Sequence, residues 1–125
     1  MSERRIKITA GSVTAEAVLN DSRTAGKIWN ALPIEAEGDT WGDEIYFSIP
    51  VKDSPAADAK DVVRLGELGY WPPGTAFCIF FGRTPVSKGD EIRPASAVNP
   101  IGMVIGDPKV FKKVRSGEKI VLEKA

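Results

Sequence analysis

The sequence has no histidine and no glutamine, and its 125 residues include one cysteine. Without histidine the chain cannot form a serine–histidine or cysteine–histidine catalytic pair, and it cannot bind a metal through imidazole. The lone Cys78 can form neither an internal disulfide nor a thiolate zinc site, which fits a reducing cytoplasm. We therefore expect no metal and no cofactor, and only carboxylates, lysine, arginine, tyrosine and one thiol remain for chemistry.

The chain also lacks net charge and long apolar runs. Lysine plus arginine equals aspartate plus glutamate, at 17 each, so we expect no general attraction to nucleic acid or to an anionic membrane. The basic residues between Lys109 and Arg115 are interpreted as a solvated face. No stretch approaches the roughly 18 apolar residues of a membrane helix, and no signal segment follows the polar N-terminus. The sequence predicts a cytoplasmic protein, and it does not indicate the oligomeric state.

The length and the 42% apolar content suit one domain with one core over residues 1–125. Alternating or continuous apolar residues predict eight short strands. These lie at residues 4–9, 13–19, 34–37, 41–49, 62–65, 77–81, 101–105 and 120–122. Eight short strands favour a closed β-barrel, because closure removes exposed strand edges, and a β-sandwich is the alternative.

One or two short helices complete the predicted fold. The run Asn20-Asp21-Ser22 consists of residue types that cap helices, and it predicts a helix over about residues 22–31. Trp29 would close one end of the core, and Pro33 prevents continuation of the helix. A single helical turn is predicted at residues 107–111. Residues 51–61 are small and charged, and they predict an exposed loop.

The most distinctive segment spans residues 66–85 and reads GELGYWPPGTAFCIFFGRTP. It predicts a rigid, proline-containing turn that leads into a strand buried on both faces. This segment, together with the WGDEIYF of residues 41–47, resembles the signature of a family of small prokaryotic cyclophilin-like proteins. The resemblance implies an eight-stranded cyclophilin-type barrel flanked by helices, in a family whose biochemical role is not established.

Classical cyclophilins are peptidyl-prolyl isomerases that place an arginine beside an apolar proline pocket. Their Phe-His-Arg motif has its nearest counterpart here in residues 46–50, YFSIP, which contain neither histidine nor arginine. Their glutamine-containing motif is also missing. The resemblance therefore carries over the barrel and not the catalytic residues.

A relocated arginine could still lower the barrier of roughly 18–20 kcal/mol to prolyl isomerisation by donating to the proline nitrogen. Arg83, at the end of the apolar strand, is the best candidate, ahead of Arg64 and Arg93. The alternative for Arg83 is an exposed turn residue, as most arginines are.

A ligand-binding groove is the leading functional hypothesis, with a small molecule or a proline-containing peptide as the partner. Its predicted polar groups are Glu44 and Arg83, and its predicted walls are Tyr46, Tyr70, Trp71 and Phe80. In the alternative interpretation the aromatic residues only pack over the barrel, and the face of Glu44 and Tyr46 is solvated. Cys78 is expected to point into the core as a small hydrophobic residue and not to be a reactive thiol. A prolyl isomerase and a protein-interaction module are the competing functions.

Overall fold

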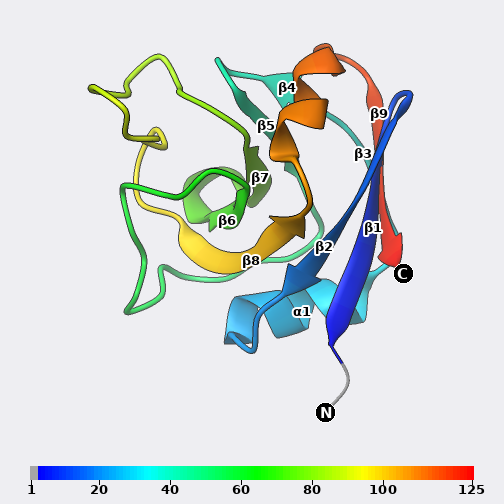
Figure 1. Cartoon of the computed structure of the whole chain (residues 1–125). Helices are drawn as coiled ribbons and strands as arrows, with labels where there is room; N and C mark the ends of the chain where they lie inside the picture. The colour runs from blue at the N-terminus through cyan, green and yellow to red at the C-terminus, as the bar shows by residue number, and fades with distance from the viewer. Residues whose placement is uncertain (1–2) are drawn as a thin grey trace.

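The computed structural model describes residues 3–125, which form a nine-stranded sheet that curls into a nearly closed barrel (Figure 1). The strand order is β3-β9-β1-β2-β8-β6-β7-β5-β4, and every pairing is antiparallel. The strands are β1 (Arg4–Ala10), β2 (Val13–Leu19), β3 (Ile34–Glu37), β4 (Asp39–Thr40), β5 (Glu44–Ser48), β6 (Glu67–Trp71), β7 (Ala76–Phe80), β8 (Asn99–Ile105) and β9 (Lys119–Lys124).

The two edges of the sheet meet at one residue. β3 and β4 are the outermost strands, and only Gly38 separates them in the chain. The Gly38 amide donates to the Glu118 carbonyl at 2.9 Å, and its carbonyl accepts from the Gly117 amide at 2.8 Å. A Cβ at Gly38 would lie 2.8 Å from the Ile120 side chain, so glycine allows the chain to cross here. The barrel therefore closes where the chain runs through Gly38 from β3, at one edge of the sheet, to β4, at the other edge.

The predicted mainly β barrel is confirmed, but it contains nine strands in this part of the chain rather than eight. The segment predicted as one strand at 41–49 is β5 alone, preceded by a turn and the short β4. Residues 62–65 form no strand and make only an isolated bridge from Val63 to Ile92. The strand lies just beyond, at β6, where glycine, tyrosine and tryptophan had indicated a turn.

The helical predictions are correct in place. Helix α1 (Arg23–Ala31) begins at Ser22, whose hydroxyl accepts from the Ala25 amide at 3.2 Å, and it lies across one end of the barrel (Figure 1). Two 3-10 helices follow, η1 (Pro72–Gly74) and η2 (Pro108–Lys113), of which the second was predicted as a helical turn. No helix among residues 3–125 is long and apolar enough to cross a membrane.

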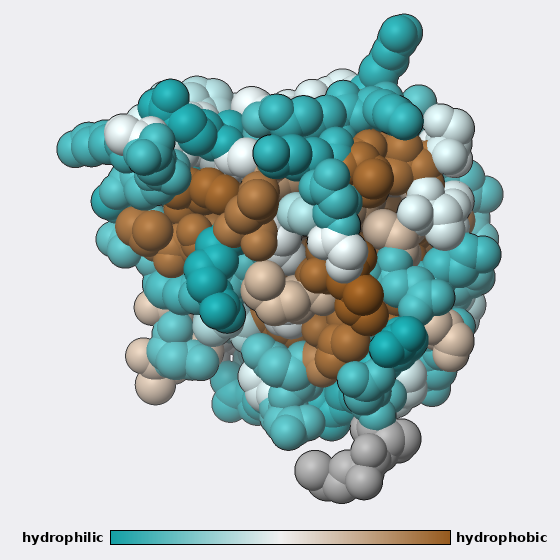
Figure 2. All heavy atoms as spheres, in the orientation of Figure 1, coloured by the Kyte–Doolittle hydropathy of each residue, from teal (hydrophilic) through white to brown (hydrophobic). Residues whose placement is uncertain are grey.

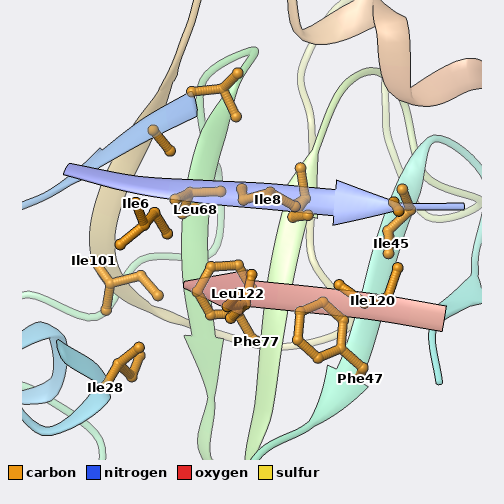
Figure 3. Packing of buried hydrophobic residues seen from close by; sticks show 14 of the residues in the cluster. Ile6, Ile8, Ile28, Ile45, Phe47, Leu68, Phe77, Ile101, Ile120 and Leu122 are labelled. Atoms are coloured by element: carbon orange, nitrogen blue, oxygen red, sulfur yellow. The ribbon is translucent and has the colours of Figure 1, made fainter. Parts of the chain in front are cut away.

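The core fills the barrel interior (Figure 3). Alternate residues of most strands point inward, and Ile28 contributes from α1. Phe47 and Phe77, on neighbouring strands, stack with ring centroids 5.2 Å apart. Burying aliphatic and aromatic side chains of this size contributes about 1.5–3 kcal/mol each, so this cluster is the main source of stability.

A second, smaller cluster covers the outer face of the same sheet. Every residue of β7 is buried, as the apolar sequence predicted, because its outward side chains Ala76, Cys78 and Phe80 lie beneath loops. Val63 comes from the loop before β6, whereas Ile92 and Val98 come from the long connection between β7 and β8. This outer cluster forms the base of the candidate site.

Candidate functional site

An apolar pocket with a cavity volume of about 290 Å³ opens on the outer face of β5, β6 and β7. Its walls combine three aromatic side chains, one carboxyl, one thiol and small apolar residues. The lining residues are Trp41, Glu44, Tyr46, Trp71, Cys78, Pro94, Ala95 and Val98. On the molecular face drawn in Figure 2, hydrophobic side chains gather in separate patches between hydrophilic ones.

Strand alternation directs the side chains of β5 to the pocket. Ile45 and Phe47 point into the core, so Glu44 and Tyr46 point outward on the same strand. Tyr46 pairs directly with Cys78 of β7 across the sheet, which places both on the pocket wall.

Trp71 is held in place by the turn that follows it. A Cβ at Gly74 would lie 2.9 Å from the Trp71 ring, so the indole packs closely over the backbone of η1. The indole nitrogen donates to the Ser96 hydroxyl at 2.7 Å. The residue at the end of η1, Thr75, adopts φ 46°, a left-handed conformation that completes the tight turn. The proline-containing turn therefore holds the Trp71 indole at the pocket.

The opposite wall comes from the β7–β8 connection, which its own polar contacts hold together. The Ser87 hydroxyl accepts from the Thr84 amide at 3.0 Å and from the Arg93 amide at 3.1 Å. The Thr84 hydroxyl donates to the Arg93 carbonyl. These bonds fix the backbone immediately before Pro94 and Ala95, which reach the pocket.

Glu44 is the unusual residue of the site. It is 5% exposed, and its Oε1 has no hydrogen-bond partner. Burial raises the pKa of this carboxyl to about 7, and the neighbouring Cys78 thiol opposes the rise only in part. The burial of Cys78 itself, together with the nearby Glu44, raises the pKa of the thiol well above its usual value, so the thiol stays protonated.

The structure brings together three of the six predicted site residues: Glu44, Tyr46 and Trp71. Phe80 is fully buried in the outer cluster, under the pocket rather than on its surface. Tyr70 faces the opposite way, into the core, because it alternates with Trp71 along β6. Its hydroxyl donates to the Val51 carbonyl at 2.7 Å, so Tyr70 is not a wall of this pocket.

Arg83 does not reach the pocket either. It is exposed, and its guanidinium donates to the Ser87 carbonyl at 3.3 Å, in accordance with the alternative interpretation as a turn residue. No arginine of the described chain, residues 3–125, lines the pocket.

Sequence reasoning missed Trp41 and the wall formed by residues 94–98. Trp41 belongs to the segment 41–47 that carries the family resemblance, but the sequence predicted one strand over residues 41–49 and no turn between Trp41 and β5. Pro94, Ala95 and Val98 carry no sequence signal, because their position depends on how a long loop folds back over β6 and β7.

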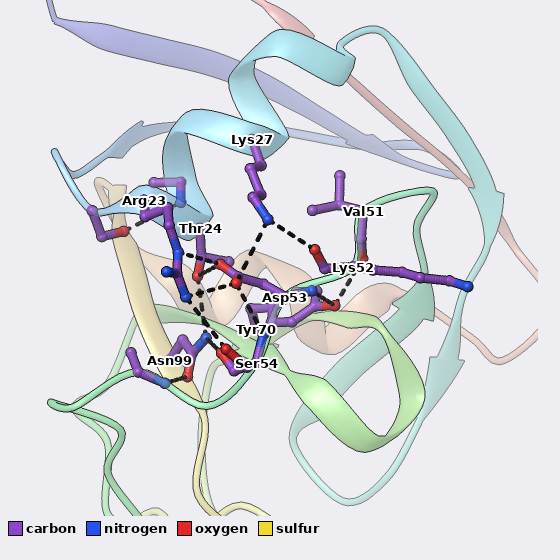
Figure 4. A network of polar contacts seen from close by, with 12 residues as sticks. Arg23, Thr24, Lys27, Val51, Lys52, Asp53, Ser54, Tyr70 and Asn99 are labelled. Carbon is purple, nitrogen blue, oxygen red and sulfur yellow. Dashed lines mark hydrogen bonds and ion pairs between the residues drawn. The ribbon is translucent and has the colours of Figure 1, made fainter.

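A second buried carboxylate lies away from this pocket, in the network drawn in Figure 4. The Asp53 side chain is 3% exposed and accepts from the Thr24 hydroxyl at 2.6 Å, from Arg23 at 2.8 Å and from the Ser54 amide at 2.9 Å. Lys27 lies 3.6 Å away. The Thr24 hydrogen bond, ahead of the contributions of Arg23 and Ser54, lowers the pKa of Asp53 to about 2.

Asn99 extends this network from β8. Its amide nitrogen donates to the Thr24 hydroxyl at 3.1 Å and to the Ser54 carbonyl at 3.0 Å, and its oxygen accepts from the Ala56 amide at 2.8 Å. Every one of these buried groups has a partner, so the network ties the loop after β5 to α1 and β8. Among residues 3–125, no group of three or more acidic or cysteine side chains is arranged to hold a metal ion.

The fold and the pocket define a small β-barrel protein with an outward-facing pocket lined by aromatic side chains. The family model described as Cyclophilin-like matches residues 4–123, and the chain belongs to this family. No functionally curated protein matches it.

Two solved structures resemble the barrel. The solution structure of the hypothetical protein AF2241 from Archaeoglobus fulgidus is 44% identical, with a TM-score of 0.85 over 98% of this chain and 95% of that one. The structure of McbB in complex with tryptophan is 12% identical, with a TM-score of 0.68 over 95% of this chain. The chain corresponds to only 44% of McbB, and this likeness shows the fold alone.

Proposed function

We propose that this protein binds a small molecule or a short peptide segment in the pocket between Trp41, Tyr46 and Trp71. The observation that supports the proposal is the combination of mainly apolar walls with one buried, unpartnered polar group, Glu44. Ligand sites in proteins have this composition, because apolar walls supply affinity and a few polar groups fix orientation. The lone, buried Cys78 is compatible with the cytoplasmic location that the sequence predicts.

The competing function, prolyl isomerisation by a relocated arginine, has no supporting contact. The candidate donor Arg83 is exposed and outside the pocket. A protease-coupled assay with a proline peptide should therefore show no acceleration over the uncatalysed rate. Acceleration that disappears in Arg83→Ala would contradict this expectation.

A ligand screen tests binding directly. Small molecules and short peptides are screened by thermal shift, because a ligand that binds only the folded state raises the melting temperature. A true pocket ligand should stabilise the wild type and Trp29→Phe, whose substitution lies against the core, but not Trp71→Ala. A ligand that stabilises Trp71→Ala equally would contradict the assignment of the site.

A further inference from the structure

We propose that the ligand of this pocket carries a primary or secondary ammonium group, which lies among Trp41, Tyr46 and Trp71 and donates a hydrogen bond to Glu44. The inference rests on the proposed function, since it names the chemistry of the ligand that the pocket binds. It follows from three features: a carboxyl oxygen without a donor, the aromatic walls and the absence of a competing cation.

The first feature is the unpartnered Oε1 of Glu44. Buried polar atoms normally have a partner, and leaving one without costs more than the net gain of an ordinary hydrogen bond. Glu44 is only 5% exposed, and its side chain lines the pocket. Because Oε1 itself is almost fully enclosed, the Glu44 side chain has to turn slightly toward the pocket that it lines. An N–H donor of a ligand in the pocket then completes the hydrogen bonding that the protein leaves open.

The second feature is the aromatic walls. Trp41, Tyr46 and Trp71 all line the pocket beside the carboxyl. The face of an aromatic ring attracts a cation, most strongly for tryptophan, and the attraction increases when the cation is shielded from water. A quaternary ammonium would use these faces but has no N–H for Glu44. Both features together therefore favour a primary or secondary ammonium.

The third feature is that no basic side chain of the described residues lines the pocket. Two basic side chains near the pocket already have acidic partners. Lys112 pairs with Asp43, the residue before Glu44, at 3.7 Å, and Arg93 of the adjoining loop pairs with Glu91 at 2.6 Å. These cations are therefore engaged by other carboxylates. When Glu44 is ionised, its charge is therefore left for a ligand to neutralise.

Proton linkage gives a consequence that can be measured. The titratable groups that line the pocket beside Glu44 are the Cys78 thiol of β7 and the Tyr46 phenol of its own strand, whereas the lining residues of β6 and of the loop over the pocket are not titratable. An alkylammonium stays charged up to a pKa near 10.4, so only Glu44 changes state near neutrality. Since the ionised form binds the cation, the affinity should rise about tenfold from pH 6 to pH 8.

The test uses the full chain and three probes that share a five-carbon chain: pentylamine, pentyltrimethylammonium and pentan-1-ol. Indole N–H signals in proton–nitrogen NMR spectra report the site, because Trp41 and Trp71 line the pocket, whereas Trp29 packs against the barrel core and serves as an internal reference. Titrations are run on the wild type, on Glu44→Gln and on Glu123→Gln, which removes an exposed carboxylate paired with Lys7.

Pentylamine should shift the two pocket indoles and bind more tightly than the other two probes. Glu44→Gln should weaken pentylamine by about tenfold or more and leave pentan-1-ol within about twofold, while Glu123→Gln changes neither. The rise in affinity from pH 6 to pH 8 in the wild type provides a second measurement that does not depend on how well the variant folds.

Equal binding of pentan-1-ol and pentylamine, unchanged in Glu44→Gln, would overturn the ammonium inference and leave the proposed function standing. If no probe and no compound of the thermal-shift screen moves the pocket indoles, both fail. A lysine blocked at both backbone ends distinguishes the source of the ammonium. Tighter binding of this probe than of pentylamine supports a peptide side chain, and the reverse supports a free amine.

Discussion

Two buried carboxylates of this barrel have opposite surroundings. Asp53 accepts hydrogen bonds from a hydroxyl, a guanidinium and a backbone amide, and its pKa falls to about 2. The Glu44 side chain is also enclosed, yet one of its oxygens has no partner, and its pKa rises to about 7. Burial alone therefore does not set the charge of a carboxyl group; the donors around it do.

A third acid supports this comparison. Glu67 of β6 is buried, but its carboxyl binds Lys60 at 2.7 Å and accepts from the Arg64 amide at 2.9 Å. Glu67 and Asp53 both face donors of this chain and tie loops to the barrel. Glu44 instead faces a pocket, so the difference separates residues that hold the structure from a residue available to a ligand.

The largest expected effect is at Asp53. Asp53→Asn removes the charge that three donors and a nearby lysine surround, and it should lower the free energy of unfolding by about 3 kcal/mol near pH 7. Urea denaturation measures the change. The control is Asp58→Asn, an exposed acid of the same loop, which should alter stability by less than about 0.5 kcal/mol. Equal effects of the two substitutions would show that the network is not what stabilises the loop.

The next effect is the pH dependence that Glu44 imposes. The unfolded carboxyl ionises near its ordinary pKa of 4.5, whereas the folded one keeps its proton up to about 7. The unfolded state therefore binds fewer protons between these values, and stability should fall by about 2 kcal/mol from pH 5 to pH 8. The absence of histidine leaves this range otherwise almost free of side-chain titration.

Denaturation curves at several pH values check this expectation. Glu44→Gln should flatten the profile between pH 5 and pH 8, while Glu123→Gln should retain the wild-type slope. An unchanged slope in Glu44→Gln would mean that another group titrates. Asp53 has the opposite sign: its lowered pKa contributes stability above its ordinary range, and this contribution is lost as the pH falls toward 2.

Most of the barrel could be predicted, because its strands alternate or run apolar. The exceptions have local causes. β6 contains glycine and is followed by two prolines, so its composition indicates a turn although its residues pair with both β7 and β8. Residues 62–65 alternate like a strand but meet the sheet only through Val63. Pairing partners, which the sequence does not display, decided both cases.

The site was predictable only where it lies on strands. Glu44 and Tyr46 share a face that strand alternation identifies, but whether that face is solvated or covered depends on the loop over it. The same alternation places Tyr70 and Trp71 on opposite sides of the sheet once both belong to one strand. The sequence had indicated a turn for both residues, and a turn does not predict that their side chains lie on opposite sides.

A smaller effect separates the two tyrosines. Tyr70→Phe should cost about 1.5 kcal/mol, because the Val51 carbonyl and the Asp53 amide both lose a partner. Tyr46→Phe should change stability by less than about 0.5 kcal/mol, since its hydroxyl lies on an exposed wall of the pocket. Thermal denaturation of both variants measures the two costs. A loss of stability in Tyr46→Phe as large as in Tyr70→Phe would mean that the Tyr46 hydroxyl holds the structure together and is not free for a ligand.

The smallest effect is expected at Arg23, whose side chain is 66% exposed although it contacts Asp53 at 2.8 Å. An exposed cation is screened by solvent, so Arg23→Ala should cost less than about 1 kcal/mol, and the cost should shrink further in about 0.5 M salt. A loss as large as that of Asp53→Asn, measured by the same urea denaturation, would mean that the ion pair satisfies Asp53. A small loss would instead show that the buried Thr24 hydroxyl and the Ser54 amide are the donors that satisfy Asp53. Among residues 3–125, Oε1 of the Glu44 carboxyl has no hydroxyl or amide donor of this kind.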